Sequence, residues 1–398
     1  MNTTIAYLNS NDDTGLLALG EASRFVLTNV DAFYKIQSYL DQNQGRFVFC
    51  CLSYDLKEET LNSISENDDF LKFPKAVFWC PEVVVRINNE TIASVEYGVL
   101  EEHHKFQINA FFNQKSASVN WNARIQARTS KENYVSNVKK LLGEIQFGNI
   151  YEVNYCQEFF DDNFELKKPE AAYFRLNTIT EAPFSAYVSF DQFRVLCGSP
   201  ERYIQKKANQ LISQPIKGTS KRGRNKEEDA LLKKALLANQ KERSENVMIV
   251  DLVRNDLSKI AEKSSVKVDE LFGVYSFKTV HQMISTVSCV LKPDVNFTGI
   301  LEASFPMGSM TGAPKKSAVE LIEKHENFSR GLYSGSIGYI APNGDFDFNV
   351  VIRSIIYNNE KKYLSCAVGG AITIQSTPEA EYEECKVKIK TILDQMHG

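Results

Sequence analysis

The chain has 398 residues, of which 43% are hydrophobic and 24% are charged, a composition typical of folded globular proteins. Its 46 basic and 50 acidic residues give a net charge of −4 at pH 7, which provides no electrostatic reason to bind nucleic acid or an anionic membrane. The length allows two domains or one two-lobed unit.

The eight cysteines are scattered and none forms a Cys-x-x-Cys pair. We therefore expect reduced, buried thiols in a cytoplasmic protein rather than disulfides or a zinc site. The first residues lack a basic stretch followed by an apolar core, so they do not predict a signal peptide. No apolar run approaches the roughly 20 residues that a membrane helix needs.

Residues 1–125 predict a mixed segment in which short β-like runs, such as 46–49 and 81–87, alternate with polar stretches. Because no recognisable chemistry falls in it, we assign it a structural or regulatory role and expect catalysis from residues 126–398. A helix is then predicted after Ser130 as its N-cap, followed by an extended run over residues 150–160.

The middle of the chain combines strands with long helical patterns. Close spacing favours an antiparallel meander of four strands, at residues 184–190, 194–197, 202–206 and 210–216. A charged loop follows at residues 220–226, and residues 227–260 predict a long helix with a break near Ser244.

The last third repeats the hairpin pattern. Strands are predicted at residues 333–341, 346–357 and 363–374, and Pro-Asn-Gly-Asp at 342–345 is a hairpin turn between the first two. A final helix is expected over residues 378–396. Hairpin-built sheets with helices on their faces predict an α+β fold.

Two acidic pairs suggest a metal site. Glu242 and Glu245 are three residues apart in one helical pattern, and Glu381 and Glu384 repeat this spacing in the last helix. Two helix faces that each offer paired carboxylates would suit Mg²⁺, a hard cation that prefers oxygen ligands. Ordinary solvated helix faces are the alternative, which spacing alone favours.

Two glycine-containing segments could bring backbone close to a ligand. The first, at residues 305–315, precedes a predicted helix, whose N-terminal N–H groups could bind a carboxylate or phosphate, although the Gly-Lys-Ser/Thr ending of a P-loop is missing. The second is Gly369-Gly370. Tight packing is the alternative explanation for both.

Three single residues also have chemical potential. Lys217 lies at a strand end between apolar and small residues, where burial could make it nucleophilic, although an exposed lysine is the commoner case. His281 could act in a site or simply be a buried core histidine. The guanidinium of Arg353 could bind a ligand carboxylate through two hydrogen bonds. A structural ion pair within the protein is an equally good explanation for this arginine.

The order of these segments resembles the family of chorismate-binding enzymes over about residues 130–395. The segments that carry the resemblance are Ser-Pro-Glu at 199–201, Pro-Ile-Lys-Gly-Thr at 215–219, Glu-Asn-Val-Met-Ile-Val-Asp-Leu at 245–252, Gly-Ser-Met-Thr-Gly-Ala-Pro-Lys at 308–315 and Pro-Glu-Ala-Glu at 378–381. The resemblance implies two lobes whose large, mainly antiparallel sheets pack as a sandwich, with helices outside and the active site between them.

The resemblance also implies residue roles. Mg²⁺ would be bound directly by Glu245 and Glu384, and through water by Glu242 and Glu381. Glu201 would be the general acid that lets the C4 hydroxyl of chorismate leave as water. The residues implied to contact the substrate are His281, Thr311, Gly312, Tyr339, Arg353, Gly369, Gly370 and Ala371.

Lys217 distinguishes between members of the family. In anthranilate synthases the segment that matches residues 215–219 resembles Pro-Ile-Ala-Gly-Thr. A lysine at its third position is typical of aminodeoxychorismate synthases. It implies that Lys217 adds to C2 of chorismate, after which ammonia enters at C4, expels the lysine and gives the precursor of p-aminobenzoate and folate. Ammonia is expected from a separate glutamine amidotransferase subunit, because 398 residues leave no room for that domain.

Three alternatives remain open. Anthranilate synthesis would give a different product from the same substrates. Isochorismate or salicylate synthesis would use the lysine to activate water and would need no ammonia. A catalytically idle subunit that binds a partner is the non-enzymatic reading.

Overall fold

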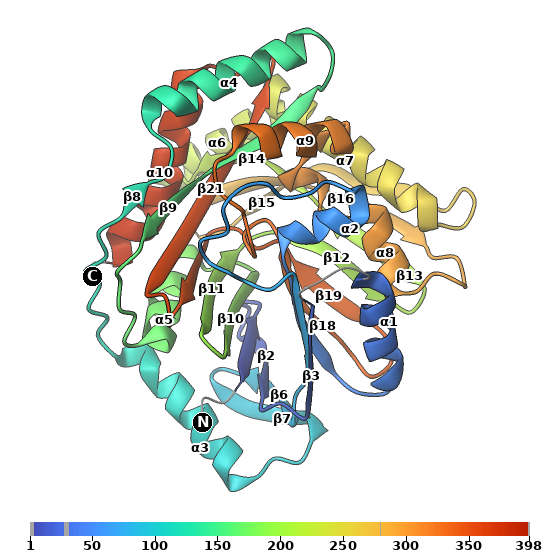
Figure 1. Ribbon diagram of the computed structural model, residues 1–398, viewed down its shortest axis with the longest axis vertical. Coiled ribbons are helices and arrows are strands. Elements are labelled where there is room, and N and C mark those ends of the chain that lie inside the picture. Colours follow the sequence, from blue (N-terminus) through green and yellow to red (C-terminus); the bar gives the residue numbers. More distant parts are fainter. Residues whose placement is uncertain (1–3, 28–31, 279, 397–398) are drawn as a thin grey trace.

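The computed structural model describes residues 4–27, 32–278 and 280–396. Two large sheets of antiparallel strand pairs form its centre, and helices lie outside them (Figure 1). This is the α+β arrangement of two large antiparallel sheets that the sequence predicts. Within the described part of the chain, no helix is long and apolar enough to cross a membrane.

The first sheet runs in the order β17 (Gly312–Ala313), β9 (Glu152–Asp161), β21 (Tyr363–Thr373), β20 (Ser354–Asn358), β11 (Phe193–Ser199), β10 (Phe184–Phe190), β1 (Ile5–Asn9), β2 (Thr14–Leu19), β6 (Val83–Asn88) and β7 (Thr91–Gly98), with β8 (Gln126–Ala127) also paired to β9. The second sheet runs in the order β14 (Ile216–Lys221), β16 (Val280–Val290), β13 (Gln210–Gln214), β12 (Arg202–Lys207), β19 (Phe346–Asn349), β18 (Ser336–Ile340), β4 (Val48–Leu52), β5 (Ala76–Cys80) and β3 (Ser23–Leu27), with β15 (Lys267–Ser276) paired to β16.

The helices are α1 (Ala32–Gln42), α2 (Lys57–Leu61), α3 (Glu102–Asn113), α4 (Lys131–Gln146), α5 (Pro169–Thr180), α6 (Lys226–Ala238), α7 (Gln240–Ile260), α8 (Phe297–Ser304), α9 (Lys315–His325) and α10 (Pro378–Met396). Three short 3₁₀ turns are η1 (Tyr54–Leu56), η2 (Gln114–Ser116) and η3 (Gly308–Met310).

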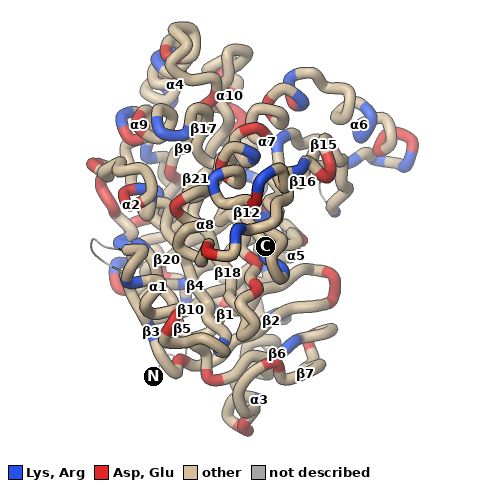
Figure 2. Tube along the Cα trace, turned by 90° about the vertical axis from the view of Figure 1, so that its right-hand side faces the viewer, with Lys and Arg blue, Asp and Glu red and all other residues tan. Residues whose placement is uncertain are grey.

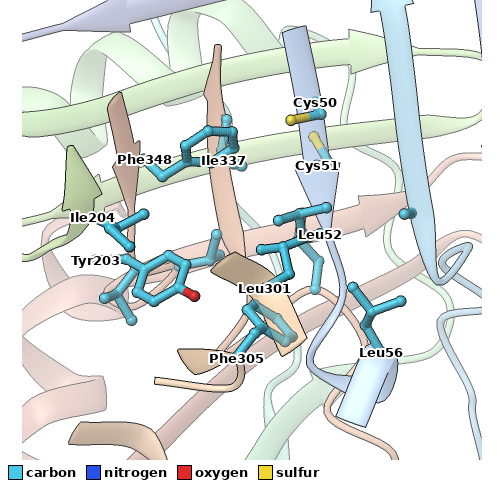
Figure 3. Packing of buried hydrophobic residues seen from close by; sticks show 14 of the residues in the cluster. Cys50, Cys51, Leu52, Leu56, Tyr203, Ile204, Leu301, Phe305, Ile337 and Phe348 are labelled. Carbon is cyan, nitrogen blue, oxygen red and sulfur yellow. The ribbon is translucent and has the colours of Figure 1, made fainter. Parts of the chain in front are cut away.

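The hydrophobic core has two parts. One joins the facing sides of the two sheets with α1, α7 and α8, and the other lies between the first sheet and α3, α4, α5, α9 and α10. Figure 3 shows Leu301 of α8 close to Leu52, Ile337 and Phe348 from the second sheet. Each fully buried side chain of this kind contributes about 1.5–3 kcal/mol to stability. This packing fixes the sheets that carry the site.

The segment before residue 125 contributes to both sheets. Strands β1, β2, β6 and β7 extend the first sheet, whereas β3, β4 and β5 form one end of the second. The predicted division at residue 125 therefore does not coincide with a break in either sheet, and a separate role for the first 125 residues stays a prediction.

Elements with strong local signals agree with the sequence. Helix α4 begins after Ser130, whose hydroxyl accepts a hydrogen bond from the Asn133 N–H as an N-cap does. Helix α10 spans the predicted residues 378–396, and strands β18 and β19 form the hairpin around residues 342–345. All eight cysteines are buried free thiols, as expected.

The predicted four-strand meander is wrong. β10 and β11 pair in the first sheet, but the chain then crosses to the second sheet at residues 199–201, where β12 and β13 form the next hairpin. The last predicted segment, 210–216, is divided into β13 and β14, and β14 continues to Lys221 in the expected loop. A local pattern specifies hairpins, but it does not specify which sheet each hairpin joins.

Two further boundaries differ. The predicted strand 346–357 is divided between β19 in the second sheet and β20 in the first, because the chain crosses back through residues 350–353 and Arg353 adopts a left-handed φ of 53°. The helix break lies at Asn239 rather than Ser244. The Asn239 side chain accepts a hydrogen bond from the Glu242 N–H, which caps α7 and sets Glu242 in its first turn.

Candidate active site

Lys217 is buried and forms an ion pair that the sequence does not predict. Its Nζ lies 2.7 Å from Oε1 of Glu152, the first residue of β9, and only 9% of Lys217 is exposed. Gly218 beside it has a φ of +98°, and the pairing of β14 with β16 is irregular there, so the strand bends at the lysine. The reading of Lys217 as an ordinary exposed lysine is therefore wrong.

The charge on Lys217 is set by opposing effects. Burial lowers the pKa of the lysine, but the carboxylates of Glu152, Glu245 and Glu201 outweigh burial and raise its pKa above the ordinary value. In the free protein Lys217 is thus an ammonium group held among carboxylates.

Glu201 is a buried carboxylic acid near the lysine. It lies where the chain crosses from β11 to β12, and its N–H donates a hydrogen bond to the Ser199 hydroxyl at 3.1 Å. Burial raises the pKa of Glu201 to about 7, although the nearby Ser309 and Lys217 oppose the rise. A group with this pKa is substantially protonated at neutral pH and can serve as a general acid.

Glu242 and Glu245 lie on α7, and Glu381 and Glu384 lie on α10. Burial, together with the Glu384 carboxylate, raises the pKa of Glu242, so the two helix faces lie near each other. Their joint role as a metal site stays a prediction. Burial raises the pKa of Glu245 to about 7, whereas Lys388 holds the pKa of the more exposed Glu384 below its usual value despite the opposing effect of burial.

The donor set of these four glutamates fits a hard cation. Oε1 of Glu245 is buried without a hydrogen-bond partner in the described residues, which leaves an oxygen for a ligand. Basic groups already approach the carboxylates: Lys388 Nζ lies 2.7 Å from Glu384, and Lys241 Nζ lies 3.8 Å from Glu245. Among the described residues, no three of these carboxylates have ligand oxygens within 4.8 Å of one another.

Arg353 lies at the second crossing between the sheets, where it has no ion-pair partner among the described residues. Burial lowers the pKa of Arg353, and the hydroxyl of Tyr333 is the titratable group that opposes this. A largely buried guanidinium without a carboxylate partner among the described residues is suited to an anionic ligand. Substrate binding by Arg353 stays a prediction.

The implied role of Tyr339 as a substrate contact stays a prediction. Its ring packs on Phe47 and Phe49, and it lines a separate cavity together with Arg86 and Asp347. The tyrosine next to Arg353 is Tyr333, which the sequence reasoning missed because its local pattern is simply that of a core residue.

The glycine-rich turn lies directly against β9. Gly312 and Ala313 form β17 and pair with Val153 and Glu152, and a Cβ at Gly312 would stand 2.2 Å from the Glu152 carbonyl oxygen. Only glycine permits this approach. The hydroxyl of Thr311 is buried and bonds back to carbonyl oxygens of the same turn.

Gly369, Gly370 and Ala371 lie on β21, paired with β9 at residues 154–156. A Cβ at Gly370 would be 3.2 Å from Oε2 of Glu381, so this glycine lets α10 bring its carboxylates close to the sheet. The two glycine-containing segments thus lie on either side of β9, as the proposed site requires.

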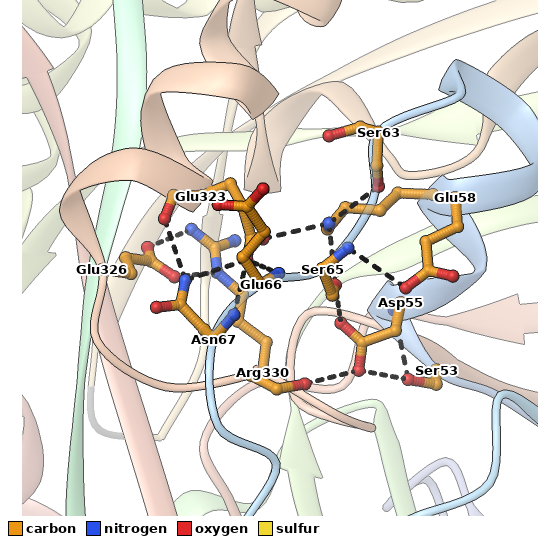
Figure 4. A network of polar contacts seen from close by, with 12 residues as sticks. Ser53, Asp55, Glu58, Ser63, Ser65, Glu66, Asn67, Glu323, Glu326 and Arg330 are labelled. Carbon is orange, nitrogen blue, oxygen red and sulfur yellow. Dashed lines mark hydrogen bonds and ion pairs between the residues drawn. The ribbon is translucent and has the colours of Figure 1, made fainter.

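A buried ion pair holds the turn and β9 together. Arg330 binds Glu326 and also donates hydrogen bonds to the carbonyl oxygens of Met310 and Asn154, each at 2.8 Å. Figure 4 shows this pair within a larger polar network that includes Asp55 and residues around it. Arg330 therefore fixes the backbone that carries the site.

His281 does not make its contacts with Lys217 or Glu201. Both of its ring nitrogens are engaged, one with the Ser276 hydroxyl and one with the Asp229 carboxylate, each at 2.9 Å, and the side chain is fully buried. In this structure its position is that of a satisfied core histidine. A direct role at the substrate stays a prediction.

A cavity opens beside Glu245, between α7 and the end of β21. Its lining includes Tyr151, Lys241, Met248 and Ile374. On the side of the molecule that Figure 2 shows, basic and acidic residues are interspersed, and neither charge sign forms one large region. The cavity gives a small molecule access to the acidic helix face.

A second group of possible ligands lies far from this site in the sequence. Glu82, His103 and His104 bring their ligand atoms within 4.8 Å of one another. However, Nδ1 of His104 accepts the Glu101 N–H, so in the neutral ring Nε2 carries the proton and faces Glu82. This arrangement caps α3 and does not present a free nitrogen to a metal.

A buried acid, a lysine among carboxylates and an arginine without an ion-pair partner in the described residues are groups that an enzyme acting on an anionic small molecule could use. Residues 4–394 match the family described as chorismate binding enzyme. The chain therefore belongs to the chorismate-binding enzyme family.

Relatives support this membership. The aminodeoxychorismate synthase component 1 of Escherichia coli is 32% identical over 352 residues, which is 86% of this chain and 75% of that protein. That of Klebsiella aerogenes is 39% identical over 69% of this chain and 60% of its own length. The chloroplastic aminodeoxychorismate synthase of Arabidopsis thaliana is 41% identical over 66% of this chain, which spans only 28% of that protein.

Solved structures share the fold. Anthranilate synthase component I from Streptococcus pneumoniae superposes with a TM-score of 0.81 at 22% identity, covering 96% of this chain and 92% of that one. The menaquinone-specific isochorismate synthase of Escherichia coli gives 0.77 at 18% identity, covering 100% and 89%. These proteins carry different activities on one fold, so the fold does not select the reaction.

Proposed function

We propose that this chain is an aminating transferase, aminodeoxychorismate synthase component I, which converts chorismate and ammonia into 4-amino-4-deoxychorismate. The observation that carries the proposal is Lys217, a buried lysine placed near the protonated acid Glu201. The names of the relatives from Escherichia coli, Klebsiella aerogenes and Arabidopsis thaliana support it.

The residues of the chain account for the chemistry. The amine of Lys217 forms a bond to C2, the diene electrons shift, and the C4–O bond breaks. Because hydroxide is a poor leaving group, Glu201 gives its proton to that oxygen, which departs as water. Ammonia then bonds to C4, the electrons shift back and the C2–N bond to Lys217 breaks.

Substrate binding would rest on Arg353, with Tyr333 beside it and the glycine backbones of β17 and β21 around the ring. Chorismate carries two carboxylates, and the largely buried guanidinium of Arg353, without an ion-pair partner among the described residues, would gain from such an anion. Thr311 and Gly312 would line the same space through the turn that pairs with β9.

The metal is part of the proposal. Glu245 and Glu384 would bind Mg²⁺ directly, and Glu242 and Glu381 would hold its waters, on the ground of the unpartnered Glu245 oxygen and the oxygen-only donor set. When bound, the cation would neutralise a substrate carboxylate and draw electron density from the ring.

Ammonia would come from a partner subunit, a glutamine amidotransferase. The relatives from two bacteria are named component 1, which supports an assembly of more than one chain. The product would feed p-aminobenzoate and folate synthesis. The buried free thiols support a reducing compartment such as the cytoplasm.

The test is the product formed from chorismate. The purified chain with chorismate, Mg²⁺ and ammonium at alkaline pH should yield 4-amino-4-deoxychorismate, identified by chromatography and mass. Anthranilate as the product would contradict the proposal. Isochorismate or salicylate formed at the same rate without ammonium would do so as well.

A further inference from the structure

We propose that Glu152 is the group that takes the ammonium proton of Lys217 before the lysine attacks and returns it when the lysine leaves. The inference deepens the proposed function and rests on its covalent step. Glu152 lies on β9, outside every segment in which the sequence suggests chemistry.

An acceptor is needed because Lys217 starts as an ammonium ion. Both side chains of the Lys217–Glu152 ion pair are buried, so in the free protein Nζ is held as an ammonium group and has no lone pair to give to carbon. The proton has to move to a group within hydrogen-bond reach of Nζ. Among the described residues, Glu152 is the carboxylate that ion-pairs with Nζ, at 2.7 Å.

Glu152 can accept that proton without losing another bond. It is 1% exposed, and its Oε2 has no hydrogen-bond partner in the part of the chain that the structure describes. No bound donor therefore has to be displaced when the carboxylate becomes an acid. Glu152 also has no assigned task in metal binding or in leaving-group departure.

The backbone holds this carboxylate in place. Glu152 pairs with Ala313 of β17 on one side and with Thr373 of β21 on the other. The contact of Gly312 with the Glu152 carbonyl keeps β17 close. A proton acceptor that is fixed between two strands needs little reorganisation during the reaction.

The other charged groups around Lys217 have different tasks. The carboxylates that influence it or are influenced by it are Glu152, Glu201, Glu242, Glu245 and Glu384. Glu201 has to arrive protonated to release water, so it cannot also accept the lysine proton. The glutamates of α7 and α10 belong to the proposed cation site, and Lys241 and Lys388 lie against two of them.

With this assignment every proton is accounted for. Nζ gives a proton to Glu152 and bonds to C2, while Glu201 gives a proton to the departing C4 oxygen. Ammonia bonds to C4 and passes one proton to Glu201, which restores the acid. The C2–N bond then breaks, and Lys217 regains its proton from Glu152. The net change is chorismate plus ammonia to the amino product plus water.

The first experiment measures the pair without substrate. Full-length wild-type protein and Glu152→Gln are treated with cyanate, a small reagent that carbamylates free amines, at about pH 8, and Lys217 is quantified by peptide mass. Loss of the carboxylate should lower the lysine pKa, so carbamylation should rise roughly tenfold for each unit of pKa lost. Equal rates of Lys217 carbamylation in the two proteins would contradict the proposal that Glu152 controls the ionisation of Lys217.

The second experiment measures turnover. Glu152→Gln keeps an oxygen for the Lys217 hydrogen bond, so a purely structural role predicts near wild-type kcat. The proton-acceptor role predicts a fall in kcat of about 10²–10⁴-fold near pH 7 with KM little changed, and the loss should shrink as pH rises, because more of Lys217 is then a free amine that needs no acceptor. Retention of wild-type kcat and pH profile would overturn the proposal.

Chemical rescue separates the two roles further. Glu152→Ala leaves space for a small carboxylate, and sodium formate should restore at least about tenfold of its lost kcat. Lys217→Ala should gain nothing from formate, and neither should the wild-type protein. Absence of rescue in folded Glu152→Ala, together with full activity of Glu152→Gln, would leave Glu152 as a structural partner only.

Failure of the proposed function would be visible separately. If the wild-type protein formed no 4-amino-4-deoxychorismate, the covalent step would be contradicted whatever Glu152 does. The ratio of the Lys217 carbamylation rates in wild type and Glu152→Gln would still show whether Glu152 controls the ionisation of Lys217.

Discussion

Glu201 and Arg353 lie at neighbouring points where the chain crosses between the two sheets. The Val350 N–H donates to the carbonyl oxygen of Glu201 at 3.0 Å, and the Gly198 N–H donates to that of Arg353 at 3.1 Å. The two crossings are thereby bonded to each other. This brings the backbone segments that carry Glu201 and Arg353, 152 positions apart in the sequence, next to each other.

The first prediction concerns substrate binding at this crossing. Arg353→Gln should raise the KM for chorismate by about 10–100-fold, because it removes charge-assisted hydrogen bonds worth about 1.5–3 kcal/mol. Steady-state kinetics measure the change. Arg86→Gln, in the separate cavity that Tyr339 lines, is the matched control and should leave KM unchanged.

A pair of tyrosine variants tests the second prediction. Tyr333→Phe should raise KM for chorismate by about 5–10-fold, because the variant cannot donate a hydrogen bond to a substrate carboxylate held at Arg353. Tyr339→Phe should not, because its ring packs on Phe47 and Phe49. A larger rise in KM for Tyr339→Phe than for Tyr333→Phe would indicate that Tyr339 is the tyrosine that contacts the substrate.

The third prediction concerns stability and pH. The pKa of Glu201 is raised to about 7, so the folded state binds a proton more tightly than the unfolded chain, and stability declines as pH rises from about 4.5 to about 7. Glu201→Gln removes this decline. At pH 8 the variant should be more stable than wild type by up to about 3 kcal/mol, measured by urea unfolding.

The difference should vanish near pH 4, where Glu201 is protonated in both states. An equal gap between wild type and variant at pH 4 and pH 8 would show that folding does not raise the pKa of Glu201. Catalysis should be lost in the same variant, because the amide has no proton to give to the C4 oxygen.

The fourth prediction separates the charge of Lys217 from its nucleophilicity. Lys217→Arg keeps a cation for Glu152 and should fold, yet it should not aminate chorismate at C4. Lys217→Ala leaves the buried Glu152 unpaired and should also lose about 3–5 kcal/mol of stability. Product analysis and urea unfolding give both results, and wild-type product from either variant would exclude the covalent role.

The fifth prediction concerns the metal. Glu245→Gln and Glu384→Gln should each abolish the Mg²⁺ dependence together with activity, and calorimetric titration of Mg²⁺ should show weaker binding. Glu379→Gln, an exposed position on the same helix α10, is the control. An unchanged Mg²⁺ titration in the first two variants would remove these glutamates from the ligand set.

Some site residues could be found because their signal is local. The i,i+3 spacing of Glu242 with Glu245 places both on one helix face whatever the helix packs against. The same reasoning could have found Lys241 and Lys388, each four residues from a glutamate that it contacts. Glu152 carried a weaker signal: an acidic residue in a strand that is otherwise largely buried needs a partner.

The sequence by itself determined the local elements, the order of the motifs and the kinds of groups available. Helices α4 and α10 and the hairpin at residues 342–345 follow from caps, periodicity and turn residues, which act over a few positions. The family resemblance rests on the same linear order.

Only the tertiary structure decided which groups meet. The pairing of Lys217 with Glu152, the proximity of Tyr333 to Arg353 and the contact of His281 with Asp229 all depend on which sheet each strand joins. Sheet membership is set by the burial of whole faces and by contacts between distant segments, and no short stretch of sequence contains that information. Lys217 is an ammonium ion among carboxylates for the same reason.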